Sequence, residues 1–249
     1  MNFEVNRGII AGIVAATAVL AGSRMTRADV IAQWTFETSQ PTSAGPVSPE
    51  VGAGTATATH SGTATYSDVT NNTAASGNGS SFCWGSTGWN VNDTNFWQFQ
   101  VSTVGYNAIQ LGYDQVSSNT GPNAFVLEYS TDGTNFTSFG SAYTANPNST
   151  FNGTNYAWSS TAANANDHYS FDLSSIPGLS DASSVDFRVA VEATGQASNS
   201  TKAVSGSGLN FIDNVTVSGT PDGASAPEPA SLGIMALGAA SLLNRRQKH

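Results

Sequence analysis

Apolar and polar residues alternate along most of the chain between its two ends. The period of two is clearest in residues 96–102, 109–113, 125–129 and 185–192. Because successive side chains of a strand point to opposite faces, these segments are expected to be half-buried antiparallel strands. No window outside the two ends has the apolar spacing of a helix. The pattern predicts an all-β fold of about eight to ten strands, a jelly-roll-like β-sandwich of two antiparallel sheets.

Clusters of turn-forming residues separate these strands. Asp132-Gly133 predicts a tight hairpin between strands at 124–130 and 135–140, because glycine readily adopts the positive φ that such turns need. Residues 39–63, with three prolines, and the Asn-rich residues 144–166 are expected to be surface loops with little apolar area to bury.

Charge is scarce and unevenly distributed in this 249-residue chain, of which only 10% is Asp, Glu, Lys or Arg. Between Asp29 and Asp222 there are 15 acidic residues (17 minus two near the ends) and two basic ones, Arg188 and Lys202, a formal charge of −13 (2 − 15). Such a body repels nucleic acid and anionic surfaces, so no nucleic-acid partner is expected. The single cysteine, Cys83, excludes an internal disulfide and is expected to be a small core residue.

The N-terminal segment has the three parts of a secretory signal peptide. Arg7 precedes an apolar run over residues 8–20, and small and polar residues follow as far as Ala28. The run is too short to span a bilayer comfortably. Residues 1–28 are therefore predicted to be a signal peptide that directs export through the Sec translocon, with cleavage after Ala28 or after Ala21.

The C-terminal segment is also divided into three parts. Pro227-Glu228-Pro229 is followed by an uncharged run over residues 230–243 and then by a basic cluster that includes Arg245 and Arg246. Lys and Arg are retained on the cytoplasmic side, and the run falls short of the ~20 residues of a stable span. We therefore expect only transient membrane contact, through a segment joined to the body by a linker at 219–226.

The order and spacing of these three parts resemble the PEP-CTERM sorting signal of exported bacterial proteins, here residues 227–249. The resemblance implies recognition by an exosortase and cleavage near Pro227-Glu228-Pro229. It also implies delivery to the cell surface or extracellular matrix of a Gram-negative-type bacterium. An ordinary tail anchor is the alternative.

The body, residues 29–218, is similar to the sandwich domains of PEP-CTERM proteins and to jelly-roll carbohydrate-binding modules, in which the first and last strands are neighbours. The similarity rests on residues 34–37 (WTFE), 125–133 (FVLEYSTDG) and 211–217 (FIDNVTV). It implies a non-enzymatic role, binding or structural, in exopolysaccharide or biofilm. An extracellular polysaccharide hydrolase and a purely structural coat protein are the alternatives.

Asp213 is the most informative acidic residue. It is in phase with Phe211 and Val215, so it is expected to point into the interior unless the strand bulges. A buried carboxylate must be protonated, hydrogen-bonded, paired with a base such as Arg188, or bound to a cation such as structural calcium. The resemblance to carbohydrate-binding modules suggests Glu37 as a second calcium ligand, although Glu37 is in phase with polar residues.

Three tryptophans are candidate ligand-binding residues. Trp84, Trp89 and Trp158 stand beside Gly, Ser or Asn, and rings exposed on loops could stack on sugars. The alternative is that each ring caps the core. No catalytic residue is predicted: His168 follows Asp167, but no Gly-x-Ser-x-Gly motif accompanies them, and His168 is expected at a strand edge.

Overall fold

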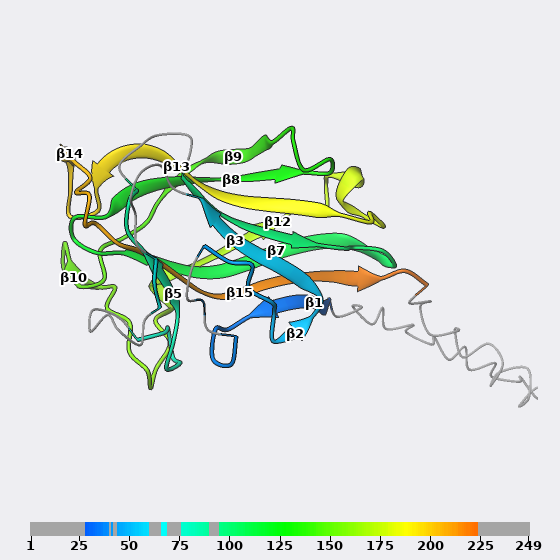
Figure 1. Ribbon diagram of the computed structural model, residues 1–249, viewed down its shortest axis with the longest axis horizontal. Helices are drawn as coiled ribbons and strands as arrows, with labels where there is room; N and C mark the ends of the chain where they lie inside the picture. Colours follow the sequence, from blue (N-terminus) through cyan, green and yellow to red (C-terminus); the bar gives the residue numbers. More distant parts are fainter. Residues whose placement is uncertain are drawn as a thin grey trace, which may run out of the picture. The chain divides into compact units, whose positions relative to one another are not determined.

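The computed structural model describes residues 28–39, 41, 44–59, 66–68, 76–89 and 95–223 (Figure 1). Residues 27–224 form one compact unit. The predicted sorting residues, Pro227, Glu228, Pro229, Arg245 and Arg246, lie outside the described residues, as does the predicted signal peptide apart from Ala28. In the part of the chain that is described, no helix is long and apolar enough to cross a membrane.

Nearly all the regular structure of the described residues is β-strand. The strands are β1 (Asp29–Trp34), β2 (Val51–Gly52), β3 (Gly54–Thr59), β4 (Tyr66–Asp68), β5 (Trp84–Ser86), β6 (Phe96–Val101), β7 (Tyr106–Ser117), β8 (Pro122–Ser130), β9 (Thr137–Thr144), β10 (Thr150–Phe151), β11 (Thr154–Asn155), β12 (His168–Asp172), β13 (Val185–Gln196), β14 (Asn199–Ala203) and β15 (Asn210–Pro221). Two short 3-10 helices, η2 (Ala165–Asp167) and η3 (Pro177–Leu179), connect strands.

Apart from β10 and β11, which pair only with each other, the strands form two antiparallel sheets, so the predicted sandwich is confirmed. The seven-stranded sheet has the order β12-β7-β15-β1-β2, with β5 joined to β15 and β4 to β5. The six-stranded sheet has the order β3-β6-β13-β8-β9, with β14 joined to β13. The first and last strands are neighbours, as the resemblance implied: Asp29 is opposite Gly219 and Trp34 is opposite Val215.

The main core lies between the inner faces of the two sheets and is rich in aromatic rings. Trp97 is central: its ring centroid lies 4.8 Å from that of Trp84 and 4.9 Å from that of Trp89. Trp34 packs edge-on against Phe99 at 5.2 Å. All five side chains are fully buried. Tilted and edge-on pairs of this kind add to the stabilisation that burial of such large side chains already gives.

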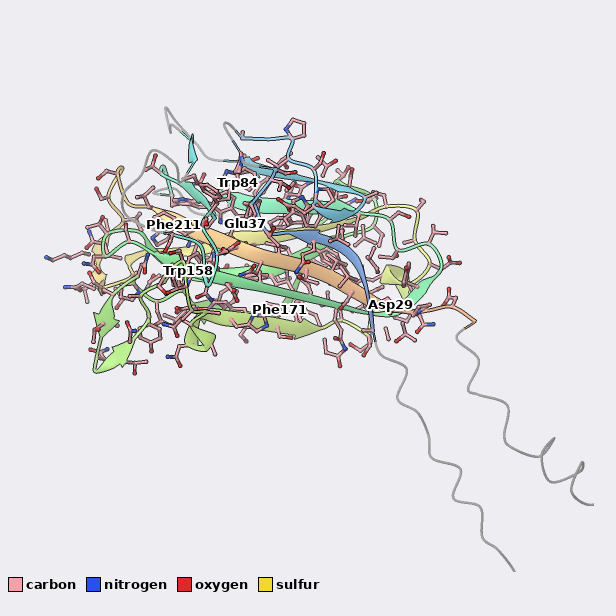
Figure 2. All side chains as sticks on the ribbon, turned by 90° about the horizontal axis from the view of Figure 1, so that it is seen from below. Asp29, Glu37, Trp84, Trp158, Phe171 and Phe211 are labelled. Atoms are coloured by element: carbon pink, nitrogen blue, oxygen red, sulfur yellow. The ribbon has the colours of Figure 1, made fainter. Side chains whose placement is uncertain are left out.

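A second, smaller apolar cluster lies on the outer face of the seven-stranded sheet. Val116 and Phe211 are opposite each other on β7 and β15 and are covered there by Cys83 and Trp158. Figure 2 shows Phe211, Trp158, Glu37 and Trp84 gathered at the end of the sheet away from Asp29. Cys83 is thus a buried core residue, as expected.

The structure refines three boundaries. The hairpin predicted at Asp132-Gly133 is confirmed: it joins β8 to β9, and Gly133 has a φ of 73°. The segments expected as loops contain strands, namely β2 and β3 within 39–63 and β10 and β11 within 144–166. In β3 the alternation is of Thr with Ala, and alanine is too small to give a strong apolar pattern. Strand β15 continues to Pro221, so residues 219–221 of the expected linker are paired in the sheet.

Candidate functional site

Polar side chains form a row across the outer face of the six-stranded sheet. The register of four strand pairs aligns five residues, one from each strand. Their neighbours along the strands, such as Phe99 and Phe187, point into the core, so these five point outward. We call this row the outer stripe; it consists of Thr57, Gln98, Arg188, Glu128 and Ser138.

Hydrogen bonds fix the middle of the outer stripe. The Nε2 amide of Gln98 donates to Oδ1 of Asp186 at 2.8 Å, and that of Gln100 donates to the same oxygen at 3.2 Å. Arg188 Nε donates to Gln98 Oε1 at 2.8 Å. Asp186 is only 1% exposed, so the two amides satisfy a buried carboxylate while their own side chains remain partly accessible.

Two aromatic rings hold the guanidinium of Arg188. Its Cζ atom lies 3.9 Å from the ring centroid of Phe96 and 3.4 Å from that of Phe136. Burial lowers the pKa of Arg188, while the charges of Glu128 and Asp186 oppose this shift. A guanidinium stays charged in proteins, so Arg188 presents fixed donors in a rigid plane.

The outer stripe suits a ligand that carries many hydroxyl groups. It combines amide and guanidinium donors, carboxylate and hydroxyl acceptors and two partly exposed rings, and cross-strand contacts hold them in place. Directional polar groups beside apolar faces are the usual composition of a site that orients a polar ligand. Apart from Phe136, which precedes β9, the side chains that would do this come from strands, which hold them more rigidly than loops do.

A bulge in β15 determines the position of Asp213. Asn214 has a φ of 51°, and the pairing of β15 with β7 shifts register between Asp213 and Thr216. Ile212 and Val215 therefore both face the main core, whereas Asp213 faces the opposite side of the sheet. The strand bulges, which is the condition under which Asp213 was not expected to point between the sheets.

Asp213 is nevertheless fully buried, under residues 76–83. Its Oδ2 accepts hydrogen bonds from the backbone N–H of Asn78 at 2.8 Å and from Ser80 Oγ at 2.9 Å, and its Oδ1 accepts from the N–H of Asn214 at 2.7 Å. Burial raises the pKa of Asp213 to about 8; the nearby Asp114 charge adds to this, and the hydrogen bonds oppose it. Burial therefore favours the protonated form of Asp213.

Asp114 is buried beside Asp213, and Asp167 is buried beside Asp114; we call these three residues the carboxylate cluster. Asp114 is 5% exposed; it accepts from Asn214 Nδ2 at 2.8 Å and contacts His168 Nδ1 at 2.7 Å. Asp167 is 0% exposed. Burial, together with the Asp114 charge, raises the pKa of Asp167 to about 7, and a hydrogen bond from the Trp158 side chain opposes this rise.

The surroundings of Asp213 fit a cation that prefers oxygen ligands. The place that a side chain on Gly77 would occupy is filled by three oxygens, Ser80 Oγ, Phe82 O and Asp213 Oδ2. The Ser80 hydroxyl has one hydrogen for two of these neighbours, which lie 3.1 and 2.9 Å from it.

Glu37, the second predicted calcium ligand, contacts the backbone of Phe82, whose carbonyl oxygen is one of these three oxygens. Glu37 Oε1 accepts from the backbone N–H of Phe82 at 2.7 Å, and the loop that carries Glu37 is held by Glu50. Among the described residues no three His, Cys, Asp or Glu side chains are placed so that they could hold one metal ion, so calcium here would also need carbonyl and hydroxyl ligands.

The three predicted sugar-binding tryptophans are not exposed. Trp84 and Trp89 are 0% exposed and pack on Trp97 in the main core, and Trp158 is 7% exposed in the second cluster. The expectation of exposed ring faces is therefore wrong. Local Gly, Ser and Asn neighbours indicated loops, but loops that cover a sheet bury their large side chains.

His168 is on the edge strand β12, as expected, and its side chain is 51% exposed. Its carboxylate partner is Asp114 from the neighbouring strand β7, rather than the adjacent Asp167.

Residues of the outer stripe were not singled out from the sequence as ligand-binding residues. The alternation that placed Trp97 and Phe187 inside also placed Gln98 and Arg188 outside, so the pattern contained this information.

Comparison of the sequence with protein-family models and with curated proteins finds no match. Several solved structures are similar in fold. The N-terminal CBM22-1-CBM22-2 tandem domain of Xyn10C from Paenibacillus barcinonensis is 13% identical with a TM-score of 0.45, and the match covers 83% of this chain and 50% of that one.

The K2 adhesin domain of Lys-gingipain is 17% identical with a TM-score of 0.44, covering 74% and 97% of the two chains. TmCBM61, solved in complex with β-1,4-galactotriose, is 11% identical with a TM-score of 0.37, covering 74% and 92%. Similarities at this level concern the fold and say nothing of the ligand of this chain.

Proposed function

We propose that this protein is a secreted, non-enzymatic component of the extracellular matrix or cell surface that binds polysaccharide through the outer stripe. The observation that supports the proposal is the row of fixed polar groups from Thr57 to Ser138, with Arg188 held between two rings. A glycan lying across the strands would meet hydroxyl, amide, guanidinium and carboxylate groups in turn. Each can donate to or accept from a sugar hydroxyl.

A polysaccharide pull-down with the purified protein tests this function. Insoluble and soluble neutral polymers would be incubated with the protein, and reducing ends would be measured in the same samples. Retention without release of reducing sugar supports binding. No retention on any polymer would leave the structural coat protein as the better description, and release of reducing sugar would indicate a hydrolase.

Export and sorting are a second part of the proposal. A signal peptide over residues 1–28 would take the chain to the Sec translocon, and Pro227-Glu228-Pro229 with Arg245 and Arg246 would present it to an exosortase. Surface material from the native host should then lack residues after about Glu228. Mass spectrometry that finds Arg245 retained would contradict this, and Pro229→Ala should cause uncleaved precursor to accumulate.

Binding of a structural calcium ion is the third part of the proposed function. Ser80, Phe82 and Asp213 would supply oxygens, with Glu37 beside them, and calcium would take the place of the proton on Asp213. A ligand that binds only the folded state stabilises it by ~2.7 kcal/mol at a hundredfold excess over Kd. The Tm should rise with calcium and fall with chelator, and Asp213→Asn should remove most of this difference. Equal Tm values for metal-free and calcium-saturated protein would exclude the site.

A further inference from the structure

A polar pocket lies at the pole of the sandwich opposite the chain ends. Both described ends leave from one pole, since Asp29 pairs with Gly219 and Pro221 pairs with Tyr106 (Figure 1). The other pole carries β10 and β14. The pocket opens there, has a volume of about 440 Å³ and is formed by one segment, residues 155–166.

The pocket is lined by uncharged groups. Asn155, Asn164 and Asn166 contribute amides, Ser159 a hydroxyl and Trp158 its indole, and four alanines complete the wall. A pocket of this composition offers hydrogen bonds and one apolar surface but no charge. The volume falls within the ~300–1,000 Å³ that small-molecule sites occupy.

The wall of the pocket is held in place by hydrogen bonds to the neighbouring loop. Asn164 N donates to Asn78 Oδ1 at 2.6 Å, and Asn78 Nδ2 donates back to Asn164 O at 3.0 Å. Gly79 N donates to Ser159 O at 2.9 Å, and the N–H of Trp158 donates to Asn148 Oδ1 at 2.8 Å. The pocket therefore does not have to form when a ligand arrives, which lowers the entropic cost of binding.

Two buried polar groups lie beside the pocket and interact with each other. Trp158 lines the pocket and is 7% exposed, and Asp167 directly follows the lining segment and is 0% exposed. A hydrogen bond from the Trp158 side chain opposes the rise in the pKa of Asp167 that burial causes. This contact fixes the indole at the wall of the pocket.

We propose that this pocket is a second ligand site, which binds a terminal unit of an uncharged saccharide. The Asn amides and the Ser159 hydroxyl would bond ring hydroxyls, and the small part of Trp158 that lines the pocket would contact the apolar face of the ring. This site does not depend on the outer stripe, which would take a chain along its length. A protein with both sites would hold two glycan chains at once, and avidity would exceed the affinity of either site.

Nuclear magnetic resonance on the purified protein tests the pocket directly. Glucose, galactose, xylose and cellobiose would be titrated to about 100 mM, in the millimolar Kd range expected of a single sugar unit. The reporter is the indole N–H resonance of Trp158, assigned from its absence in Trp158→Phe. At least one sugar should shift this resonance in a saturable manner.

Matched variants separate the pocket from its surroundings. Asn166→Ala should weaken the sugar response of the Trp158 resonance at least tenfold, whereas Asn152→Ala, at an exposed Asn on the nearby hairpin, should leave this response unchanged. Dispersed spectra show that each variant is folded. The proposal is overturned if no sugar shifts the Trp158 resonance, or if Arg188→Ala abolishes the shift and Asn166→Ala does not. Binding of polymer that is lost only in Arg188→Ala would support the outer stripe and not the pocket.

Discussion

Charged residues on the outer faces of the two sheets have different surroundings. On the six-stranded sheet, Asp186 and Arg188 are satisfied by neighbouring strands, and Gln98, Glu128 and Arg188 remain partly accessible. On the seven-stranded sheet, Asp114 and Asp213 project outward too, but residues 76–83 and 155–167 cover them.

The two faces differ in whether loops cover them, and not in the types of charged residue that they carry. On the six-stranded sheet, the buried carboxylate of Asp186 is satisfied by the amides of Gln98 and Gln100 from a neighbouring strand. Under a loop, the same group must be protonated, hydrogen-bonded or bound to a cation. We therefore expect changes in the carboxylate cluster to alter stability and changes in the outer stripe to alter binding.

The largest effect on stability is expected from Asn214→Ala. The side chain of Asn214 bonds Asp114 at 2.8 Å and the carbonyl of Asn78 at 3.1 Å, and its φ is 51°. Its loss leaves buried groups unpaired and strains the backbone, so the free energy of unfolding should fall by about 3 kcal/mol. Urea denaturation measures this.

Asn152→Ala is the matched control. Asn152 also has positive φ, 49°, but is exposed, so its replacement should cost only the backbone strain, about 1 kcal/mol. Equal losses in the two variants would mean that the hydrogen bonds of Asn214 stabilise nothing.

Gly77→Ala is a second test, which concerns the packing of residues 76–83 over Asp213. The added methyl group would meet Ser80 Oγ, Phe82 O and Asp213 Oδ2, so residues 76–83 must shift away from β15. We expect a loss of about 2 kcal/mol and a weaker response to calcium. Gly206→Ala, whose methyl group would meet nothing within 4 Å, should change little. If both variants unfold at the same urea concentration, the loop is not packed on Asp213 as described.

The pH dependence of stability tests Asp167. Its folded pKa of about 7 is above the ordinary value of 3.8, so the folded state holds the proton more tightly. The resulting stability is fully present below about pH 4 and is lost as pH rises through about 7. Asp167→Asn does not titrate, so at pH 8 it should be more stable than the unaltered protein by about 1 kcal/mol or more, but not at pH 4.

Glu192→Gln removes the same charge from an exposed position on β13 and serves as the control. It should show no such pH-dependent gain. Parallel stability curves for Asp167→Asn and the unaltered protein between pH 4 and pH 8 would show that Asp167 is not buried as an uncharged acid.

The smallest effect on stability is expected in the outer stripe. Gln98→Ala removes hydrogen bonds to Asp186 and Arg188. Gln100 still donates to Asp186, and water can reach Arg188, so the cost should be below about 1 kcal/mol. Thermal unfolding would show this. A loss as large as that of Asn214→Ala would contradict the contrast between the two faces.

The sequence was sufficient to predict the sandwich, because period-two alternation over β6, β8 and β13 leaves few other ways to bury Trp97, Leu127 and Phe187. The sequence was not sufficient to predict where the candidate site residues Asp213 and Trp158 lie. The bulge at Asn214 puts Asp213 out of phase with Val215, and the residue types alone do not show where such a bulge lies. Trp158 was misplaced because burial by a loop depends on contacts distant in sequence, here with Val116 and Phe211.

The most direct test of the central claim measures binding and stability in the same variants. Arg188→Ala and Asp167→Asn would be compared with the unaltered protein for affinity toward the polysaccharide retained in the pull-down, by isothermal titration calorimetry, and for Tm. We expect Arg188→Ala to lose at least tenfold in affinity, equivalent to about 1.4 kcal/mol, with little change in Tm. We expect Asp167→Asn to change the Tm and to leave the affinity nearly unchanged. Unchanged affinity in folded Arg188→Ala would contradict the assignment of the outer stripe as the glycan-binding face.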